Sequence, residues 1–455
     1  AVGDLAETIA LLLDDPTDAA PEIPLHAWIE KRIAPLAELD EEQKREHITK
    51  WWTELEAPER FLVNKLITGA FRVGVSRRLV TRALAALSGQ DSTLIAHRLM
   101  GDWKPSGAAF EQLVSDQPGP PDPSTPYPFF LASPLEGPAE ALGDPAEWSA
   151  EWKWDGIRAQ LIRRDGRRFL WSRGEDQLTG RFPEIEEPAD QLPEGTVIDG
   201  EILAWRDATP LPFAVLQQRI GRKRVGPKVL ARAPAALLAY DLLEDAGEDV
   251  RSWPLHRRRE RLGELIDELD SERIRLSDQV FAETWDKLAE QRDSARERGV
   301  EGFVLKRRDS PYRVGRRRGD WWKWKVDPYT IDAVMIYAQP GHGRRSNLYT
   351  DYTLALWTDD NQLVPIAKAY SGLDNREISE LDRWIRRNTV ERYGPVRAVE
   401  PVQVFELAFE GINPSSRHKS GIALRFPRIA RWRRDLSAGE ADRLSEVRRL
   451  LPDDL

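Results

Sequence analysis

Apolar residues in the first quarter of the chain follow a helical rather than an alternating pattern. In segments 48–55 and 61–67 they recur three and four positions apart, which is the spacing of one helix face. We therefore expect residues 1–116 to form an all-α domain. The chain opens on a helical pattern that is already under way, so we expect this domain to be incomplete at its N-terminus.

The pattern changes after residue 116. Residues 117–128 hold six prolines and one glycine, which is typical of a stiff, extended linker. From 129 to 326, apolar runs of strand length alternate with helical patterns, among them a charged helix over residues 255–269, and this mixture predicts an α+β domain. From 327 to 455, short strands such as 333–337 predict a small β-barrel. The expected fold is therefore multidomain.

Composition narrows the class of the protein without defining its function. The chain has 455 residues and no cysteine, which excludes a disulfide framework and a thiolate zinc site. No apolar run reaches the roughly 18 residues of a membrane span, and no secretory signal opens the chain. We expect a soluble protein of the cytoplasm, associated with the nucleoid in a prokaryote and without a membrane partner.

The chain has a net charge of −9 but contains two strongly basic segments. Residues 306–325 hold nine basic and two acidic residues, and residues 417–434 hold seven basic residues and no acidic one. Affinity for a phosphate backbone depends on such local patches rather than on the sum over the chain. The charge distribution is therefore compatible with a nucleic-acid partner.

The most informative segment is 153–158, which reads Lys-Trp-Asp-Gly-Ile-Arg. A lysine attacks phosphorus only when it is neutral, and burial beside other cations lowers its pKa. Gly156 suits a tight turn in which the backbone approaches a ligand, and Arg158 offers a fork of donors to ribose or phosphate oxygens. The segment predicts a lysine nucleophile on a loop that leads into a strand. A turn with ordinary surface charges is the alternative interpretation.

Two glutamates and a tyrosine stand in or beside apolar runs. Glu201 lies within the run 196–203, and Glu301 leads a second run. A carboxylate in an apolar strand is costly unless it is paired, hydrogen-bonded or bound to a metal, so a metal ligand and a partner for an arginine both remain open. Tyr240, within the run 236–243, could stack on a purine or belong to the core.

Two groups of basic residues offer contacts for phosphate. Alternation places Lys323 and Lys325 on one face of a short strand, where an anion such as a triphosphate would relieve their repulsion. An edge strand whose lysines face water is the alternative. Residues 425–434 hold five arginines, whose planar side chains bind phosphate with two donors at once, although a solvated basic edge would have the same composition.

In this order, the motifs resemble those of ATP-dependent DNA ligases. Lys-x-Asp-Gly-x-Arg is similar to the nucleotidyltransferase signature of DNA ligases, RNA ligases and mRNA capping enzymes. Residues 425–433 resemble the element Arg-x-Pro-Arg-x-x-Arg-x-Arg of DNA ligases, and the match departs at Leu436, where family members often have lysine. The resemblance implies a helical DNA-binding domain, an α+β nucleotidyltransferase (ATP-grasp-like adenylation) domain and a C-terminal OB-fold domain.

The resemblance also implies roles for single residues. Lys153 is the nucleophile, Glu151 accepts a hydrogen bond from the adenine amino group, and Tyr240 stacks on the base. Glu201 and Glu301 are the expected metal-linked carboxylates, with Mg²⁺ as the metal and Mn²⁺ as its substitute. The other expected ATP- and AMP-binding residues are Arg158, Arg173, Glu201, Lys323, Lys325, Arg425, Arg428 and Arg431. The expected DNA-binding residues are Arg72, Gly74, Ser76 and Arg77, where a helix beginning near Ser76 would offer its N-terminus to phosphate.

The implied reaction has three steps. Lys153 takes AMP from ATP, the AMP passes to the 5′-phosphate of a nick, and the 3′-hydroxyl closes the strand. The expected partners are ATP and nicked double-stranded DNA, bound by a monomer, whereas protein partners are left open. An RNA ligase or capping-type nucleotidyltransferase and a non-catalytic clamp on nicked DNA are the alternatives.

Overall fold

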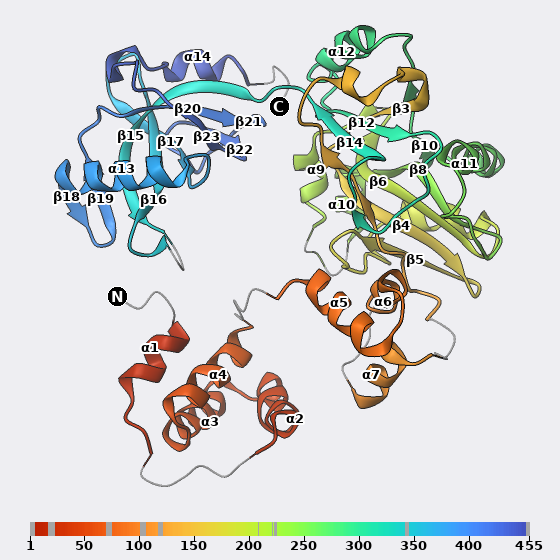
Figure 1. The fold of residues 1–455 in the computed structure, drawn as a ribbon, viewed down its shortest axis with the longest axis horizontal. Coiled ribbons are helices and arrows are strands. Elements are labelled where there is room, and N and C mark those ends of the chain that lie inside the picture. Colours follow the sequence, from red (N-terminus) through yellow and green to blue (C-terminus); the bar gives the residue numbers. More distant parts are fainter. Residues whose placement is uncertain are drawn as a thin grey trace. The chain divides into compact units, whose positions relative to one another are not determined.

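The computed structural model shows helices first and strands afterwards (Figure 1). Helices fill the described residues up to 116, strands begin at Phe130, and residues 74–326 form one compact unit. The expected order of a helical, an α+β and a β-rich region is therefore present, and the boundaries at 116 and 128 stay predictions. The described residues are 5–16, 23–69, 75–100, 106–116, 122–207, 209–220, 222, 225–341 and 345–451.

The first helices pack around buried tryptophans. Trp28 and Trp51 meet edge to face, with ring centroids 5.5 Å apart. Arg60 is fully buried and joins the first helix to the fourth, since its guanidinium donates to the carbonyl oxygens of Ala10 and Leu13. The helices are α1 (Leu5–Leu12), α2 (Leu25–Trp28), which continues into a π-helical turn (Ile29–Ile33) and a 3-10 turn (Ala34–Glu38), α3 (Glu41–Glu54) and α4 (Ala57–Thr68).

Three further helices belong to the unit 74–326. The ring of His97 on α6 stacks on Tyr127 at 4.9 Å, and burial, together with the neighbouring cation Arg251, lowers the pKa of His97 to about 4. This neutral imidazole therefore packs as an apolar ring between the helices and the segment that enters the α+β region. The helices are α5 (Arg77–Ser88), α6 (Ser92–Arg98) and α7 (Gly107–Val114).

Two sheets form the core of the α+β region. The larger has the strand order β10-β8-β6-β4-β5 and packs against α11, and the smaller has the order β11-β3-β12-β14-β2 and packs against α12. α11 confirms the helix predicted over residues 255–269.

The strands of the larger sheet are β4 (Ile157–Arg164), β5 (Arg167–Ser172), β6 (Thr196–Arg206), β8 (Ala235–Asp245) and β10 (Ile274–Leu276), with β7 (Thr209–Pro210) and β9 (Glu248–Asp249) beside them. Those of the smaller sheet are β2 (Ser133–Pro134), β3 (Trp148–Trp152), β11 (Gln279–Val280), β12 (Gly302–Arg307) and β14 (Trp321–Lys325), and β1 (Phe130–Leu131) pairs with β13 (Gly315–Arg316). The helices are α8 (Pro183–Glu186), α9 (Phe213–Gln217), α10 (Pro227–Arg232), α11 (Leu255–Leu269) and α12 (Trp285–Asp293).

The C-terminal region is a curved antiparallel sheet. Its longest strand, β15, pairs with β16 on one side and with both β19 and β20 on the other, as in the strongly coiled sheet of an OB-fold. Besides its strands it contains α13, a helix that was not predicted, which starts at a capping box on Asp374 and buries Leu381 and Ile385.

The elements of this region are β15 (Tyr329–Pro340), β16 (Tyr349–Trp357), β17 (Leu363–Ala369), α13 (Asn375–Arg387), β18 (Thr389–Tyr393), β19 (Val396–Val399), β20 (Val404–Phe409), β21 (Gly411–Pro414), β22 (Ile422–Arg425), β23 (Arg428–Trp432) and α14 (Leu444–Arg448). In the part of the chain that the structure describes, no helix has both the length and the apolar character needed to span a membrane.

Candidate active site

The lysine motif is the connection between the two sheets. β3 of the smaller sheet ends at Trp152, and β4 of the larger sheet begins at Ile157. The backbone of Lys153 exchanges hydrogen bonds with the start of β12, because its N–H donates to the carbonyl of Gly302 (2.8 Å) and its carbonyl accepts from the N–H of Glu301 (3.0 Å). The lysine is thereby held at the edge where both sheets contribute side chains.

One carboxylate oxygen joins two of the expected lysines. Oε2 of Glu301 lies 2.6 Å from Nζ of Lys153 and 3.0 Å from Nζ of Lys325. Burial opposes the charge of Glu301, but the two ammonium groups outweigh burial and hold the pKa of its carboxyl below the ordinary value. Lys153 is therefore held in place by its ion pair with Glu301.

Lys323 stands in an environment that disfavours its charge. β14 lies between β12 and β2, so the alternative of an edge strand is wrong. Burial, and next to it the charges of Lys153 and Arg316, lower the pKa of Lys323 to about 8. Positive charges that repel one another in this way are typical of a site that binds a polyanion.

Glu201 is a partly buried carboxylate that forms no ion pair with a described residue. Within the described chain it has no hydrogen-bonded partner, and burial raises its pKa to about 7 although Lys153 and Arg158 favour its charged form. The described residues contain no group of three or more potential metal ligands. Mg²⁺ usually takes one or two carboxylates and completes its shell with water and substrate phosphate oxygens, so Glu201 and Glu301 fit such an ion.

The base-binding side of the site is built around Glu151. Oε1 of Glu151 accepts from Nζ of Lys306 at 2.9 Å, and both side chains are about 3% exposed. Oε2 of Glu151 is buried and has no hydrogen-bond partner. The ring of Tyr240 on β8 lies 4.2 Å from Nζ of Lys306. The site thus offers an oriented acceptor beside an aromatic ring, as adenine recognition requires.

Arg158 has a partner that the sequence analysis missed. Its guanidinium binds the fully buried Asp199 with two donors, at 3.2 and 2.7 Å, and Asp199 also accepts from the hydroxyl of Tyr312 at 2.7 Å. Arg173 is exposed, and its backbone N–H donates to the carbonyl of Arg158. The signal for Asp199 was available, because a carboxylate two residues before Glu201 in the same apolar strand also needs a partner.

The backbone of Gly156 lies so close to β6 that a side chain would not fit between them. A Cβ at this position would lie 2.4 Å from the carbonyl oxygen of Ile202 and 2.9 Å from Cγ of Glu201. The close packing against β6 is thus a second reason for glycine at this position, beside the predicted approach of the backbone to a ligand.

We expect Gly156→Ala to displace the lysine motif from β6 and to lower the rate of self-adenylylation about 100-fold, because small misplacements of reacting groups have effects of this size. The measurement is transfer of label from α-labelled ATP to the protein. Gly226→Ala is the matched control, since a Cβ at Gly226 has no neighbour within 4 Å. Equal rates for both variants would contradict this explanation.

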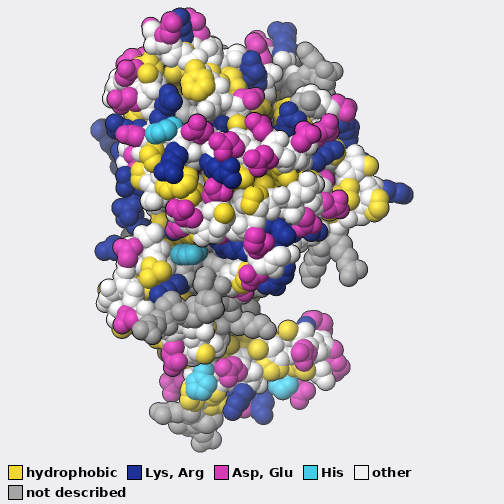
Figure 2. Space-filling view, turned by 90° about the vertical axis from the view of Figure 1, so that its right-hand side faces the viewer, with side chains coloured by type: hydrophobic (Ala, Val, Ile, Leu, Met, Phe, Trp, Pro, Cys, Tyr) yellow, Lys and Arg dark blue, Asp and Glu magenta, His cyan; other side chains and the backbone are white. Residues whose placement is uncertain are grey.

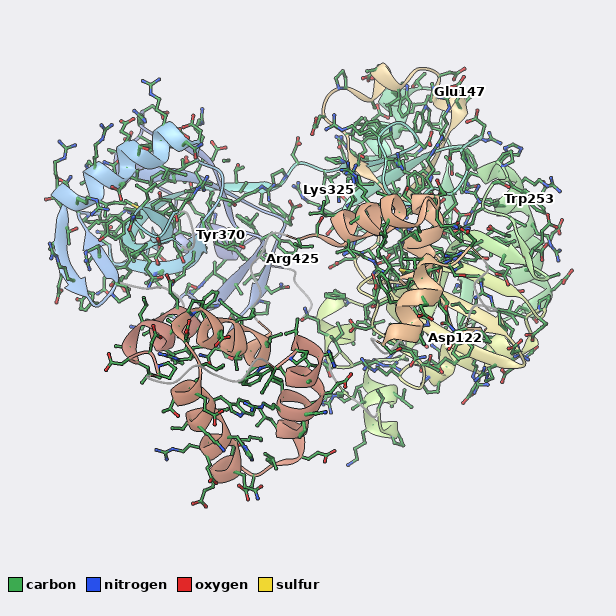
Figure 3. All side chains as sticks on the ribbon, turned by 60° about the horizontal axis from the view of Figure 1, so that its bottom comes forward. Asp122, Glu147, Trp253, Lys325, Tyr370 and Arg425 are labelled. Atoms are coloured by element: carbon green, nitrogen blue, oxygen red, sulfur yellow. The ribbon has the colours of Figure 1, made fainter. Side chains whose placement is uncertain are left out.

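The three expected triphosphate arginines lie in the C-terminal region, outside the unit 74–326. Figure 3 labels Arg425 there and Lys325 on β14. Nη1 of Arg428 lies 3.0 Å from Glu410, and Nη2 of Arg431 lies 2.9 Å from Glu406. The ion-pair partners of Arg428 and Arg431 thus belong to the same C-terminal region, and the contact of these arginines with a triphosphate stays a prediction.

Leu436 has an apolar environment that explains the departure from the family motif. It packs against a small core that contains Val334, Val404 and Ala441. A lysine at this position would have to direct its ammonium group away from that core. Leu436 thus stabilises the region and supplies no phosphate contact.

Of the expected DNA-binding residues, Arg72 and Gly74 lie outside the described residues. Ser76 is the N-cap of α5 and accepts from the N–H of Leu79, which confirms a helix that begins near Ser76. Arg77 forms an ion pair with Glu175 and donates to the carbonyl of Leu99 at 2.7 Å.

Three regions of the chain match models of known protein families. The family described as "ATP dependent DNA ligase domain" matches residues 129–325, "ATP dependent DNA ligase C terminal region" matches 345–436, and "DNA ligase N terminus" matches 1–85. Two of the most similar relatives are both named "Probable DNA ligase". The one from Koribacter versatilis is 36% identical over 417 residues, 86% of this chain and 72% of that protein. The one from Opitutus terrae is 37% identical over 86% of this chain and 45% of that protein.

A solved structure named "Pmar-Lig_Pre." shares the fold, with a TM-score of 0.63, 17% identity, and coverage of 94% of this chain and 91% of that one. The predicted fold class, of a helical N-terminal region, an α+β adenylation domain and a β-rich C-terminal domain, is confirmed. On the strength of the three matched regions and the Koribacter relative, the chain belongs to the family of ATP-dependent DNA ligases.

Proposed function

We propose that this protein seals nicks in duplex DNA through a covalent lysine–AMP intermediate on Lys153. The observation that carries this proposal is the shared carboxylate of Glu301, which holds Lys153 and Lys325 within 3.0 Å of one oxygen. This contact places a primary amine next to a second cation at the junction of two sheets. Such an arrangement suits attack on the α-phosphorus of a nucleoside triphosphate.

In the first step, Nζ of Lys153 leaves Glu301, loses its proton and forms a bond to the α-phosphorus of ATP. The bond between this phosphorus and the bridging oxygen of pyrophosphate breaks, and pyrophosphate departs with the bonding electron pair. Lys323 and Lys325 stabilise the negative charge that develops on the phosphoryl oxygens. When bound, Mg²⁺ or its substitute Mn²⁺ supplies charge neutralisation to the phosphates, and Glu201 and Glu301 are the residues that would hold it.

In the second and third steps, AMP moves to the 5′-phosphate of the nick, and the 3′-hydroxyl then displaces AMP. Positioning on DNA of any sequence needs phosphate contacts rather than base contacts. The N-terminus of α5, capped by Ser76, supports such a contact, and Arg72, Gly74 and Arg77 complete the proposed surface. On the face drawn in Figure 2, basic and acidic side chains are interspersed, in keeping with local rather than global attraction to DNA.

The nucleotide is proposed to be ATP because of Glu151. Its free oxygen, Oε2, can accept from the exocyclic amino group of adenine, with Tyr240 against the base. Guanine carries a carbonyl oxygen at that position and would leave two acceptors facing each other. Arg158 and Arg173 then lie on the ribose and phosphate side.

The C-terminal domain is proposed to act in the first step only. Arg425, Arg428 and Arg431 would bind the departing pyrophosphate, and the domain would leave the site before the nick is bound. The unit 74–326 ends next to Asp327-Pro328, which is where we place the hinge. A monomer suffices for this cycle.

A strand-closure assay tests the proposed substrate. We expect the protein, with ATP and Mg²⁺, to close a nick in duplex DNA and to leave the same nick in duplex RNA open. Preferential closure of RNA would identify an RNA ligase. Labelling by GTP rather than ATP would identify a capping-type enzyme. Binding of nicked DNA without either reaction would identify a clamp.

The rate of self-adenylylation is expected to depend on the charge of Lys323. The pKa of this lysine is about 8, so its charge is lost as the pH rises through that value. Lys323→Arg keeps the charge at all these pH values. The ratio of kcat/KM for ATP, variant over wild type, is therefore expected to stay constant below pH 7 and to rise about tenfold per pH unit above 8, because kcat/KM reports titration of the free enzyme. A ratio independent of pH would show that another group supplies the charge.

A further inference from the structure

Lys306 connects the two sides of the base site. It lies on β12 of the smaller sheet and donates to Oε1 of Glu151 on β3 of the same sheet. Its ammonium group also lies 4.2 Å from the ring centroid of Tyr240 on β8 of the larger sheet and 4.7 Å from that of Trp321. One side chain therefore touches both the expected amino-group acceptor and the expected stacking ring.

This contact leaves Glu151 with a definite orientation. A carboxylate that shares a hydrogen bond through one oxygen has its other oxygen directed elsewhere, and Oε2 is the oxygen that stays buried without a partner. A buried acceptor without a donor is unfavourable and is relieved by a ligand that brings a donor. Since Glu151 and Lys306 are about 3% exposed, water does not readily replace that donor.

We propose that Lys306 is a positioning residue for base selection, which acts through Glu151 by occupying Oε1 and directing Oε2 at the exocyclic amino group of the base. The inference rests on the function proposed above and adds a residue that sets the choice of nucleotide. Lys306 also holds the ring of Tyr240 through a cation–π contact, so the hydrogen bond and the stacking surface are kept in one geometry. The contacts of Lys306 are with Glu151, Tyr240 and Trp321 and do not include the proposed nucleophile, so Lys306 is expected to affect selection of the base rather than attack.

The first test compares ATP with purine riboside triphosphate, which lacks the amino group. Wild type is expected to prefer ATP in kcat/KM for self-adenylylation by about 10- to 100-fold, the range for a hydrogen bond to a charged group. Lys306→Met is expected to reduce this preference to within about threefold, mainly by raising KM for ATP. If Lys306 contributed to stability alone, kcat/KM would fall equally for both nucleotides and the preference for ATP would not change. That result would overturn the proposal.

A second test does not depend on tolerance of an unpaired Glu151. In Glu151→Gln, Lys306 takes the only acceptor oxygen of the amide and turns its NH₂ group toward the base. This variant is expected to lose at least about tenfold in selectivity for ATP over inosine triphosphate, whose base carries a carbonyl instead of the amino group. In Glu151→Gln/Lys306→Met the amide can turn around, and the selectivity for ATP is expected to rise again. Equal selectivity of the single and the double variant would overturn the proposal.

Arg164→Met is the matched control. It removes a cation from another largely buried ion pair on the larger sheet, with Glu244, outside the base site. We expect it to lower stability and to leave both nucleotide preferences as in wild type. Wild type that takes no label from ATP would overturn the proposed function and this inference together, whereas labelled wild type with unchanged preferences in the Lys306 variants would overturn this inference alone.

Discussion

Lys153→Ala is expected to lower the transfer of label from α-labelled ATP by at least about 10⁴-fold, because removal of a covalent nucleophile removes the reaction path itself. The protein is first treated with pyrophosphate to remove AMP already attached to it. The variant should still fold, since Glu301 keeps Lys325 as a partner at 3.0 Å and is not left as a buried, unpaired charge.

Two further variants sharpen this test. Lys153→Arg keeps a cation beside Glu301 but offers no neutral amine, so it is expected to be equally inactive. Lys287→Ala removes an exposed lysine on α12 that pairs with Glu283, and it is expected to label as wild type does. Label on Lys153→Ala would place the nucleophile elsewhere in the chain.

Substitution of the C-terminal arginines is expected to impair self-adenylylation and to spare the later steps of the reaction. Arg428→Ala should slow self-adenylylation about 100-fold or more, the size of effect seen when one donor to a developing anion is removed. Closure of a nick that already carries AMP should stay within about threefold of wild type, because that step releases no pyrophosphate. Arg425→Ala should behave in the same way.

The domain itself should tolerate this change. Arg428 and Glu410 are both partly solvent-exposed, and such ion pairs contribute little to the free energy of unfolding. Arg434→Ala is the matched control, since Arg434 pairs with Glu380 at 2.9 Å in the same domain but stands outside the arginine motif. Equal loss of self-adenylylation and of closure in Arg428→Ala would contradict the assigned role.

Much of the fold was predictable because the periodicity of each region is simple. The helix Leu255–Leu269 has the bounds that its charged and apolar spacing indicates, and the alternation at Lys323 and Lys325 correctly placed both on one face of β14. The helix α13 was missed although Asp374 and Glu377 form a recognisable capping box. The prediction of a small barrel was based on the short strands of this region and did not use that signal.

The partners of the site residues could not be predicted from sequence, since they depend on packing between distant strands. Arg158 and Asp199 are 41 positions apart, and Glu151 and Lys306 are 155 positions apart. Periodicity assigns each of these side chains to a face of its strand, but it does not show which strands become neighbours. Only the three-dimensional arrangement reveals that Arg158 is already bound by a carboxylate and that Glu151 retains a free oxygen.

The ion pairs of the C-terminal arginines bear on the proposed movement of their domain. Glu410 and Glu406 belong to the same domain as Arg428 and Arg431. They neutralise part of the positive charge of this strand in any position of the domain. Without these ion pairs, the arginines would attract RNA and other polyanions of the cell whenever the domain, as proposed, leaves the active site. The two glutamates thus weaken the attraction of this strand for polyanions, and the proposed binding of pyrophosphate requires the phosphates to displace them.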